Sequence, residues 1–368
     1  MLTTPLETLK KYVDQPSGSF DVEDVTAVAK MMAEDFASLG FTVKTIPGKQ
    51  AGPILDCSIG SGDKQLMLMG HMDTVFPHSV CVPYKDNGDG TAMGSGIIDM
   101  KGGIMILLYA LKEALPKIDL NRYTLRAILN PDEEIGSAES HDLILSTAKQ
   151  SFAALSFEPS GPKPRLTCAR KGVTSVLISC KGVPGHAGSQ YKQCASAIQA
   201  LCVQITKLYA LRDDEHDISF NAGFITGGTA ENVVASDAAC RCEFRYFDQS
   251  YQQILMDKIV AICAQEPVPG VTTTVTFGAS HPASDLTAAS QVLLDKAQAI
   301  AKAQGRDMPH EKVGGAGDIS IAAQAGIGVL DGLGMPGAKM HTVEEVAYID
   351  LIPQQIELSA KLIEAVCE

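Results

Sequence analysis

The residues best suited to chemistry begin with His71 and Asp73, which follow the apolar run Leu66–Met69. Such a run predicts a buried strand. Side chains two residues apart point to the same face of a strand, so His71 and Asp73 are expected to meet where it ends. A carboxylate that accepts one ring N–H of a histidine leaves the other ring nitrogen free for a metal. A histidine at a strand end can also be simply hydrogen-bonded, so this pair alone does not show whether His71 binds a metal.

More acids and a second histidine recur in comparable places along the chain. Each has a simpler explanation, such as the first turn of a helix, a loop carboxylate or a surface histidine. Together they are expected to converge on one sheet edge, where histidine nitrogen and carboxylate oxygen suit zinc or another borderline divalent ion. These residues are Asp99 in the glycine-rich segment Gly94–Gly103, Asp132–Glu134 after Leu125–Leu129, Glu158 after Ala153–Phe157, and His341 in Met340–Thr342.

Composition excludes several classes of protein. The net charge of −13 argues against nucleic acid as a partner, because binding nucleic acid needs clustered Lys and Arg. The N-terminus shows no signal peptide and no run is apolar for long enough to span a membrane, so a cytoplasmic protein is expected. The ten cysteines form no Cys-x-x-Cys pair, which favours buried, reduced thiols.

The first part of the chain alternates helical and strand patterns. Helices are expected over Thr26–Leu39 and Lys101–Leu115, between and around the strands Leu66–Met69, Leu125–Leu129 and Ala153–Phe157. This β–α–β rhythm predicts an α/β fold with a mostly parallel sheet covered by helices.

After the proline-rich segment Pro159–Pro164 the pattern changes to β-α-β-β-α-β, which is typical of a ferredoxin-like domain. Helix, glycine loop and strand resume after His281, so this α+β domain is predicted to be an insertion. We expect a catalytic domain formed by residues 1–168 and 280–368, and an inserted domain formed by residues 169–279. The elements expected in the insertion are strands Val173–Lys181, Ile218–Ile225, Val233–Phe244 and Thr272–Phe277, and helices Cys194–Leu211 and Tyr251–Gln265.

The five segments that carry these acids and histidines, in this order, resemble the M20 metallopeptidases. That family includes glutamate carboxypeptidase, acetylornithine deacetylase and succinyl-diaminopimelate desuccinylase. The resemblance covers nearly the whole chain and is nearest to the glutamate carboxypeptidase branch, because of Ser156–Pro159 and the pair Glu133-Glu134. It implies a zinc-peptidase-like catalytic domain with an inserted lid and dimerisation domain.

The resemblance also implies a site with two Zn²⁺ ions, for which Co²⁺ or Mn²⁺ could substitute. Asp73 would orient His71, Glu133 would act as general base and then acid, and the Asp99–Met100 peptide would be cis. Two divalent ions close together lower the pKa of a shared water and polarise the scissile carbonyl, so no nucleophilic side chain is needed. The implied ligands are His71, Asp99 and Glu158 for one ion, and Asp99, Glu134 and His341 for the other.

In the inserted domain, His186 lies in Val183–Ser189, which resembles the family's lid motif. The resemblance implies that this histidine reaches the active site of a partner subunit and stabilises the tetrahedral oxyanion. An obligate homodimer through the inserted domain would follow. Taken by itself, His186 could equally be a hydrogen-bonded turn residue.

Asn232 and Arg245 match positions that grip the substrate's carboxylate, which an arginine can do with two hydrogen bonds. The loop with Gly315 and Gly317 matches one that lines the substrate pocket with backbone N–H groups. The chain departs from the family pattern at Ala235, where proline is usual. It departs again at Gly317, where glutamate-cleaving members carry threonine.

The expected function is hydrolysis of a peptide or N-acyl amide bond next to a free carboxylate by a dizinc enzyme similar to glutamate carboxypeptidase. An N-acyl-amino-acid deacylase would share every metal ligand and differ only in its pocket. A catalytically inactive metal-binding scaffold is the third possibility. The presence of Glu133 and of every ligand position argues against it.

Overall fold

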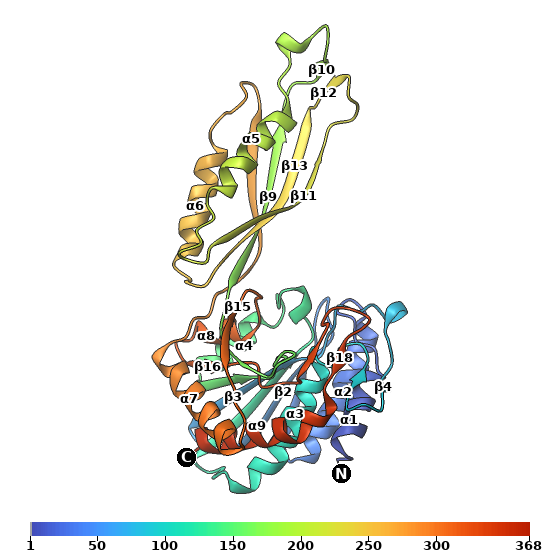
Figure 1. Ribbon diagram of the computed structural model, residues 1–368, viewed down its shortest axis with the longest axis vertical. Helices are drawn as coiled ribbons and strands as arrows, with labels where there is room; N and C mark the ends of the chain where they lie inside the picture. The colour runs from blue at the N-terminus through green and yellow to red at the C-terminus, as the bar shows by residue number, and fades with distance from the viewer. Residues whose placement is uncertain (1) are drawn as a thin grey trace. The chain divides into compact units, whose positions relative to one another are not determined.

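The computed structural model describes residues 2–368, which form two compact units (Figure 1). The main segment of unit 2 runs from Arg170 to Asp285. It begins one residue after the predicted start of the insertion, 169, and ends six residues after the predicted end, 279. The later limit shifts because Arg170 and Ser284 form a β-bridge, which keeps the chain in unit 2 beyond its last strand. Among the described residues, unit 1 comprises 2–169, 286–312 and 317–368, and unit 2 comprises Arg170–Asp285 and Val313–Ala316.

Unit 1 is built on a six-stranded sheet in the order β1-β2-β6-β3-β7-β16. Strands β6, β3, β7 and β16 run parallel to one another, as predicted. The β1–β2 and β2–β6 pairs are antiparallel, so the sheet is mixed and the expectation of a mostly parallel sheet was wrong at this edge. The strands are β1 (Thr42–Ile46), β2 (Ile54–Gly60), β3 (Lys64–His71), β6 (Tyr123–Asn130), β7 (Ser151–Ser156) and β16 (Gly328–Leu330).

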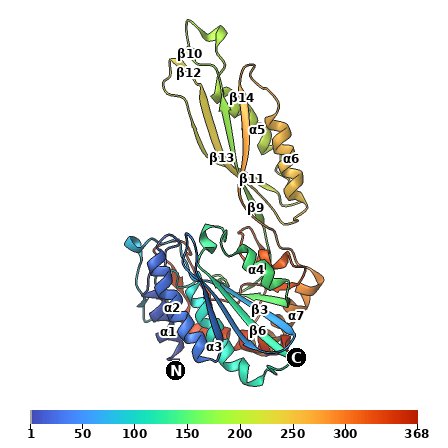
Figure 2. The ribbon, with the colours of Figure 1, turned by 180° about the vertical axis from the view of Figure 1, so that it is seen from behind.

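Both faces of this sheet are buried, which explains the continuous apolar run at Leu66–Met69. Met67 and Met69 pack into one cluster with Ile144 of α4 and Ile319 of α8. Figure 2 shows α4 beside the strands of this sheet. Helices α3 and α9 pack against each other, and α3 also packs against β3. The larger helices of unit 1 are α1 (Pro5–Val13), α2 (Val22–Ser38), α3 (Lys101–Ala114), α4 (His141–Ala148), α7 (Ala288–Ala303), α8 (Ile319–Ala323) and α9 (Ile352–Val366).

Two predicted helices of unit 1 are present with small shifts in their bounds. Helix α3 matches its prediction within one residue. Helix α2 begins four residues before Thr26, because Val22 follows Asp21 and the first turn carries two acids that favour a helix N-terminus. The shorter elements are η1 (His78–Val80), β4 (Lys85–Asp86), β5 (Ala92–Met93), η2 (Leu115–Lys117), η3 (Glu133–Ile135), β8 (Leu166–Arg170), β15 (His310–Val313), β17 (Gly337–Ala338), β18 (Val346–Ala347) and η5 (Ile349–Leu351).

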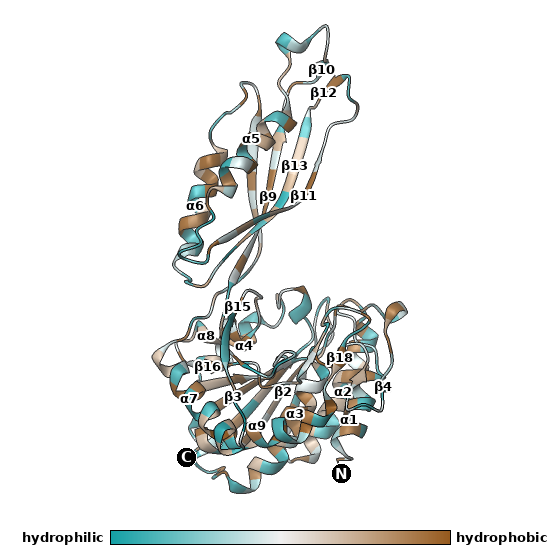
Figure 3. Cartoon of the chain, viewed as in Figure 1, coloured by the Kyte–Doolittle hydropathy of each residue, from teal (hydrophilic) through white to brown (hydrophobic). Residues whose placement is uncertain are grey.

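Unit 2 has the predicted β-α-β-β-α-β order. Its antiparallel sheet runs β11-β13-β9-β14, with α5 and α6 on one face and mixed hydrophobic and hydrophilic residues along both helices (Figure 3). The strand expected over Val233–Phe244 is divided, because Val233 and Val234 pair with β10 instead of the main sheet. The elements are β9 (Gly172–Lys181), β10 (Gly185–His186), η4 (Tyr191–Gln193), α5 (Ala197–Tyr209), β11 (Ser219–Gly227), β12 (Val233–Val234), β13 (Asp237–Tyr246), α6 (Tyr251–Cys263) and β14 (Thr272–His281).

All ten cysteines are free thiols, and most of them are buried. Within residues 2–368, we find no helix with the length and hydropathy needed to cross a bilayer.

Candidate metal centre

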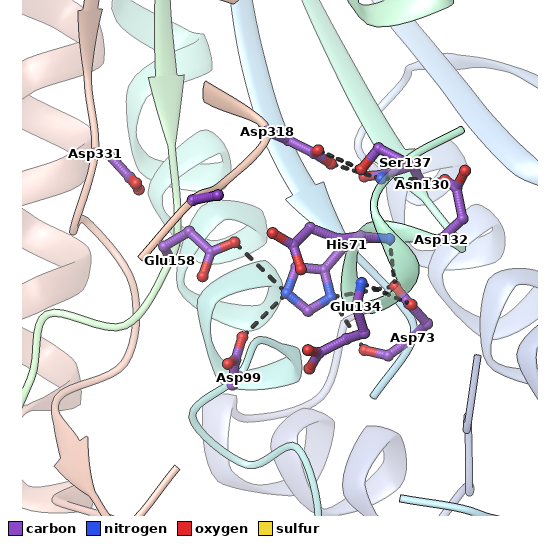
Figure 4. A network of polar contacts seen from close by, with 12 residues as sticks. His71, Asp73, Asp99, Asn130, Asp132, Glu134, Ser137, Glu158, Asp318 and Asp331 are labelled. Carbon is purple, nitrogen blue, oxygen red and sulfur yellow. Dashed lines mark hydrogen bonds and ion pairs between the residues drawn. The ribbon is translucent and has the colours of Figure 1, made fainter. Parts of the chain in front are cut away.

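Three parallel strands of unit 1 end at the same edge of the sheet. His71, the last residue of β3, lies beside Asn130, the last residue of β6, and Met69 lies beside Ser156, the last residue of β7. Residues that directly follow these strands therefore meet at the carboxyl edge, where open α/β sheets bind ligands. Figure 4 shows the acids that follow β6 and β7 gathered around His71.

The first group of potential ligands consists of His71, Asp99 and Glu158, and all three side chains are buried. The Nε2 atom of His71 lies 3.0 Å from Oδ1 of Asp99 and 3.5 Å from Oε1 of Glu158. One nitrogen and two carboxylate oxygens thus converge on one position, which a metal ion could occupy.

The second group consists of Asp99, Glu134 and His341. The Nε2 atom of His341 lies 3.0 Å from Oδ2 of Asp99 and 3.4 Å from Oε2 of Glu134. Asp99 belongs to both groups through its two oxygens, and in each group the ligand atoms lie within 4.8 Å of one another. This is the geometry of two neighbouring sites that share one carboxylate.

The polar atoms of these groups fit divalent cations. Nδ1 of His71 lies 3.0 Å from the carbonyl oxygen of Asp73, so it carries the ring proton and Nε2 presents a lone pair. Oε1 of Glu134 is buried and has no hydrogen-bond partner among residues 2–368. Lone pairs that face one another in a buried site are costly unless a cation lies between them.

The pKa shifts of the two histidines and of Asp99 show that the carboxylates of this site stabilise positive charge. Burial alone would lower the pKa of His71, but hydrogen bonds with Asp73 and Asp99 raise it well above its usual value. Hydrogen bonds with Asp99 and Glu134 raise the pKa of His341 to about 10. Burial would raise the pKa of Asp99, yet the two histidines hold it well below its usual range. The site therefore favours cations.

The Asp73 carboxylate contacts His71 and, in addition, the backbone of Glu133 and Glu134, which the sequence did not predict. Its Oδ1 lies 3.3 Å from Nδ1 of His71, as expected for an orienting carboxylate. The same carboxylate also accepts hydrogen bonds from Ser19 Oγ at 2.7 Å and from the backbone N–H groups of Glu133 and Glu134, each at 3.2 Å. Asp73 thus fixes both the potential ligand His71 and the turn that carries the two glutamates.

Glu133 lies in η3, directly before the potential ligand Glu134. Burial raises the pKa of the Glu133 carboxyl well above its usual value, although His71 offsets part of the effect. A carboxyl group with a raised pKa can both accept and return a proton near neutral pH.

The turn that carries Glu133 is attached to the start of α8. Asp318 accepts a hydrogen bond of 2.6 Å from Nδ2 of Asn130 and another from the hydroxyl of Ser137. Asp132 accepts from the backbone N–H groups of Glu139 at 2.7 Å and Ser140 at 3.2 Å, so it caps the turn and is not a ligand in either group.

Sequence reasoning missed Glu345, which holds the loop that carries Asp99. This buried carboxylate accepts hydrogen bonds from the N–H groups of Gly96 (3.0 Å), Ile98 (2.8 Å) and Asp99 (3.1 Å). The only signal in the sequence was an acid placed four residues after His341. The Asp99–Met100 peptide in this loop is cis, as the resemblance implied.

The remaining predicted residues lie in or next to unit 2. His186 is on β10, and its Nδ1 accepts hydrogen bonds from the N–H groups of Gly188 at 3.1 Å and Ser189 at 3.3 Å. Asn232 lies beside it, because its carbonyl accepts a 3.0 Å hydrogen bond from the N–H of Ala187. The structure therefore brings His186 and Asn232 together within unit 2.

Arg245 is bound on two sides. Its Nε and Nη2 donate to the two carboxylate oxygens of Glu243 at 2.7 and 3.2 Å, and its Nη1 donates to the carbonyl of Gly314 at 2.8 Å. Gly315, next along that loop, is exposed in unit 2, whereas Gly317 is buried in unit 1.

Comparison with known proteins places this geometry in a family. Residues 67–365 match the model of peptidase family M20/M25/M40. The chain is 30% identical to carboxypeptidase G2 of Pseudomonas sp. strain RS-16, over 97% of this chain and 88% of the relative. It is 29% identical to acetylornithine deacetylase of Pasteurella multocida, over 62% of each protein.

Solved structures share the fold over almost the full length. The aminopeptidase PepT of Bacillus cereus superposes with a TM-score of 0.80 at 22% identity, covering 99% of this chain and 98% of that one. The Bacillus subtilis YXEP protein, described as a dinuclear metal-binding peptidase of the M20 family, superposes with a TM-score of 0.71 at 15% identity, covering 99% and 97%.

Proposed function

Since the chain belongs to peptidase family M20/M25/M40, we propose that it is a dizinc hydrolase that cleaves a peptide or N-acyl amide bond next to a free carboxylate. At the coarser level the protein is an enzyme of the metallopeptidase type. The observation that carries the finer proposal is the pair of ligand groups sharing Asp99, with Glu133 directly beside ligand Glu134.

His71, Asp99 and Glu158 would hold one ion, and Asp99, Glu134 and His341 the other. Their mixture of imidazole and carboxylate ligands suits zinc and also accommodates Co²⁺ or Mn²⁺. When bound, such a pair of ions makes water acidic enough to lose a proton near neutral pH and polarises the scissile carbonyl.

Glu133 takes the proton from the attacking water at its carboxylate and passes it to the leaving nitrogen. Its raised pKa suits this double role, because the carboxyl can hold the proton between the two transfers. The backbone carbonyl of Asp73 keeps the proton of His71 on Nδ1. The carboxylate of Asp73 lies 3.3 Å from the same nitrogen and accepts a hydrogen bond from the N–H of Glu133, so it would align both a ligand and the base.

His186 would donate a hydrogen bond to the oxyanion of a partner subunit's substrate. Two backbone N–H groups point at Nδ1, so the ring proton lies on Nε2, which is the donor that this role needs. This role requires a homodimer, which we propose forms through unit 2.

Asn232 and Arg245 would hold the substrate's carboxylate, with Gly315 and Gly317 lining the pocket. Glu243 and Gly314 use three of the five guanidinium N–H groups of Arg245, which leaves two for a substrate. The bonds to Glu243 keep the guanidinium in one orientation.

The test is a hydrolysis screen of dipeptides and N-acyl amino acids with added Zn²⁺, Co²⁺ or Mn²⁺, with chelator-treated protein as the blank. Release of C-terminal glutamate from many acyl partners supports a carboxypeptidase. Selective removal of acetyl or succinyl groups supports the second candidate, an N-acyl-amino-acid deacylase, which the acetylornithine deacetylase relatives favour. Absence of hydrolysis with every metal contradicts the proposal.

Replacing Glu133 tests the assignment of the base. Glu133→Gln should retain two metal ions per chain, measured by mass spectrometry of the metal content, because the residue is not a ligand. Its kcat should fall by about 10²–10⁴-fold, since only the proton transfer is lost. Glu113→Gln, at an exposed site on α3, is the matched control and should keep full activity. Turnover by Glu133→Gln near the wild-type rate would refute the role.

A further inference from the structure

We propose that a pocket beside Glu134, lined by the apolar side chains of Phe20, Val75, Pro77 and Ile135, binds an uncharged hydrophobic group on the carbonyl side of the scissile bond. The inference rests on the proposed function and names the substrate class within it. The substrate would carry a hydrophobic acyl group or side chain on one side of the amide and the carboxylate on the other.

The pocket lies wholly within unit 1 and shares Glu134 with the metal centre. Its volume is 280 Å³. A cavity of about 150 Å³ is enough to enclose benzene, so this pocket has room for a group of five or six carbon atoms. Because Glu134 is both a potential ligand and part of the wall, a group in the pocket lies next to the reacting carbonyl.

The apolar side chains that line this pocket are unusually exposed to solvent for apolar residues, which suggests that a ligand covers them. Phe20 is 80% exposed, and Val75 and Ile135 are 40% and 38% exposed. Single apolar residues on a surface are ordinary, but three that gather in one concave site mark a place where binding removes apolar surface from water.

The pocket is held by the same hydrogen bonds as the metal centre. Phe20 follows Ser19, whose hydroxyl donates to Asp73 and whose N–H donates to the carbonyl of Thr74 at 3.2 Å. Val75 follows Thr74 in the chain, and Ile135 follows Glu134, whose N–H donates to Asp73. The apolar walls are therefore preformed at a fixed position relative to the ligands, which lowers the entropic cost of binding.

The charges of the pocket determine which end of the substrate enters it. The charged side chains among the described lining residues are Glu134 and Asp21, and none of these residues is basic. Asp21 also accepts a 2.8 Å hydrogen bond from the N–H of His78. Two acids repel a carboxylate, so the uncharged end of the substrate occupies the pocket.

The experiment compares two substrates that differ only in the acyl chain, N-acetylglutamate and N-hexanoylglutamate. Dissociation constants are measured by calorimetry with the zinc-loaded Glu133→Gln protein, whose strongly reduced kcat keeps the substrate intact during the titration. We expect the hexanoyl compound to bind at least about tenfold more tightly, as one or two well-buried methylene groups allow. Values of kcat/KM for the active enzyme should follow the same ratio.

Phe20→Ala should reduce this preference to less than about threefold, because the longer acyl chain loses more apolar contact than the acetyl group does. Phe20→Leu should restore most of the preference. Phe152→Ala is the matched control, because Phe152 is an exposed phenylalanine near the opposite end of the parallel strands, and it should change neither constant. Thermal melting and metal content establish that each variant is folded and loaded.

The possible outcomes separate the two proposals. If the active enzyme hydrolyses neither these compounds nor any other amide in the screen, the proposed function fails. If hydrolysis occurs but both compounds bind equally, or Phe20→Ala weakens both by the same factor, the apolar subsite is wrong and the hydrolase assignment stands. Preference for a hexanoyl group that survives Phe20→Ala also refutes the subsite.

Discussion

Glu345 and Asp73 support the potential ligands in different ways. Asp73 contacts the imidazole of His71 directly. Glu345 instead accepts hydrogen bonds from the backbone around Asp99. Burial raises the pKa of Glu345 to about 7, and the N–H groups of Ile98 and Asp99 offset part of this rise. The loop therefore depends on a buried acid whose burial is compensated by its hydrogen bonds.

We predict that Glu345→Ala lowers both stability and metal affinity. Three backbone N–H groups would lose their buried acceptor, and each unsatisfied donor costs about 1–3 kcal/mol. Loss of a residue that supports a ligand weakens metal binding by about 10- to 100-fold. Urea unfolding and equilibrium dialysis with Zn²⁺ measure the two effects. The neighbouring Glu344→Ala is the control, because Glu344 is exposed and its carboxylate pairs with Lys339 on the surface. Equal behaviour of the two variants would exclude this role for Glu345.

At the scale of elements, α3 packs unusually close to the chain that follows β7. A Cβ atom on Gly103 would lie 1.9 Å from the carbonyl oxygen of Phe157, the residue before the potential ligand Glu158. Gly334 approaches the same carbonyl from another segment, at the same distance. Only glycine allows two segments to enclose this backbone, so the Gly102-Gly103 pair at the start of the helix serves packing next to the potential ligand Glu158.

Gly103→Ala should therefore destabilise the protein, although alanine favours a helix over glycine by about 1 kcal/mol. The added methyl group has to displace the Phe157–Glu158 backbone, so zinc affinity should fall together with the melting temperature. Gly278→Ala is the control, because its methyl group would meet Ser175 at an ordinary 3.5 Å. A stabilised Gly103→Ala protein with unchanged zinc binding would show that the helix start can move freely.

At the scale of the whole molecule, the chemistry divides between the two compact units. All potential metal ligands and Glu133 lie in unit 1, whereas His186, Asn232 and Arg245 lie in unit 2. The proposed mechanism needs both sets, and the proposed homodimer would supply His186 from the second copy of the chain.

Mixing two inactive variants tests this arrangement. Glu133→Gln lacks the base and His186→Ala lacks the oxyanion donor, so each homodimer should have strongly reduced kcat. After dissociation and random reassociation, half of the dimers are mixed and each contains one complete site, giving about a quarter of wild-type activity. Light scattering should show that both variants are dimers. If mixing restores nothing while both remain dimeric, His186 does not serve a partner's site.

Much of the candidate site could be predicted from the sequence, because its residues follow strands. His71, Glu134 and Glu158 come just after apolar runs, and parallel strands bring such positions to one edge. The sequence analysis predicted no strand over Ile54–Gly60, because Asp56 and Ser58 interrupt its apolar pattern, so only the structure reveals β2 and its antiparallel pairing with β6. The role of Glu345 was also hidden, because its partners lie far away in the chain.

The sequence by itself determined which residue types could bind metal, their order along the chain, and the element order of unit 2. Short-range periodicity and motif spacing carry that information. Only the tertiary structure decided that Asp99 is shared, that Asp73 fixes both His71 and Glu133, and that Phe20 lies in a pocket beside Glu134. These features depend on contacts between segments distant in the chain, which packing and buried hydrogen bonds select and no local pattern encodes.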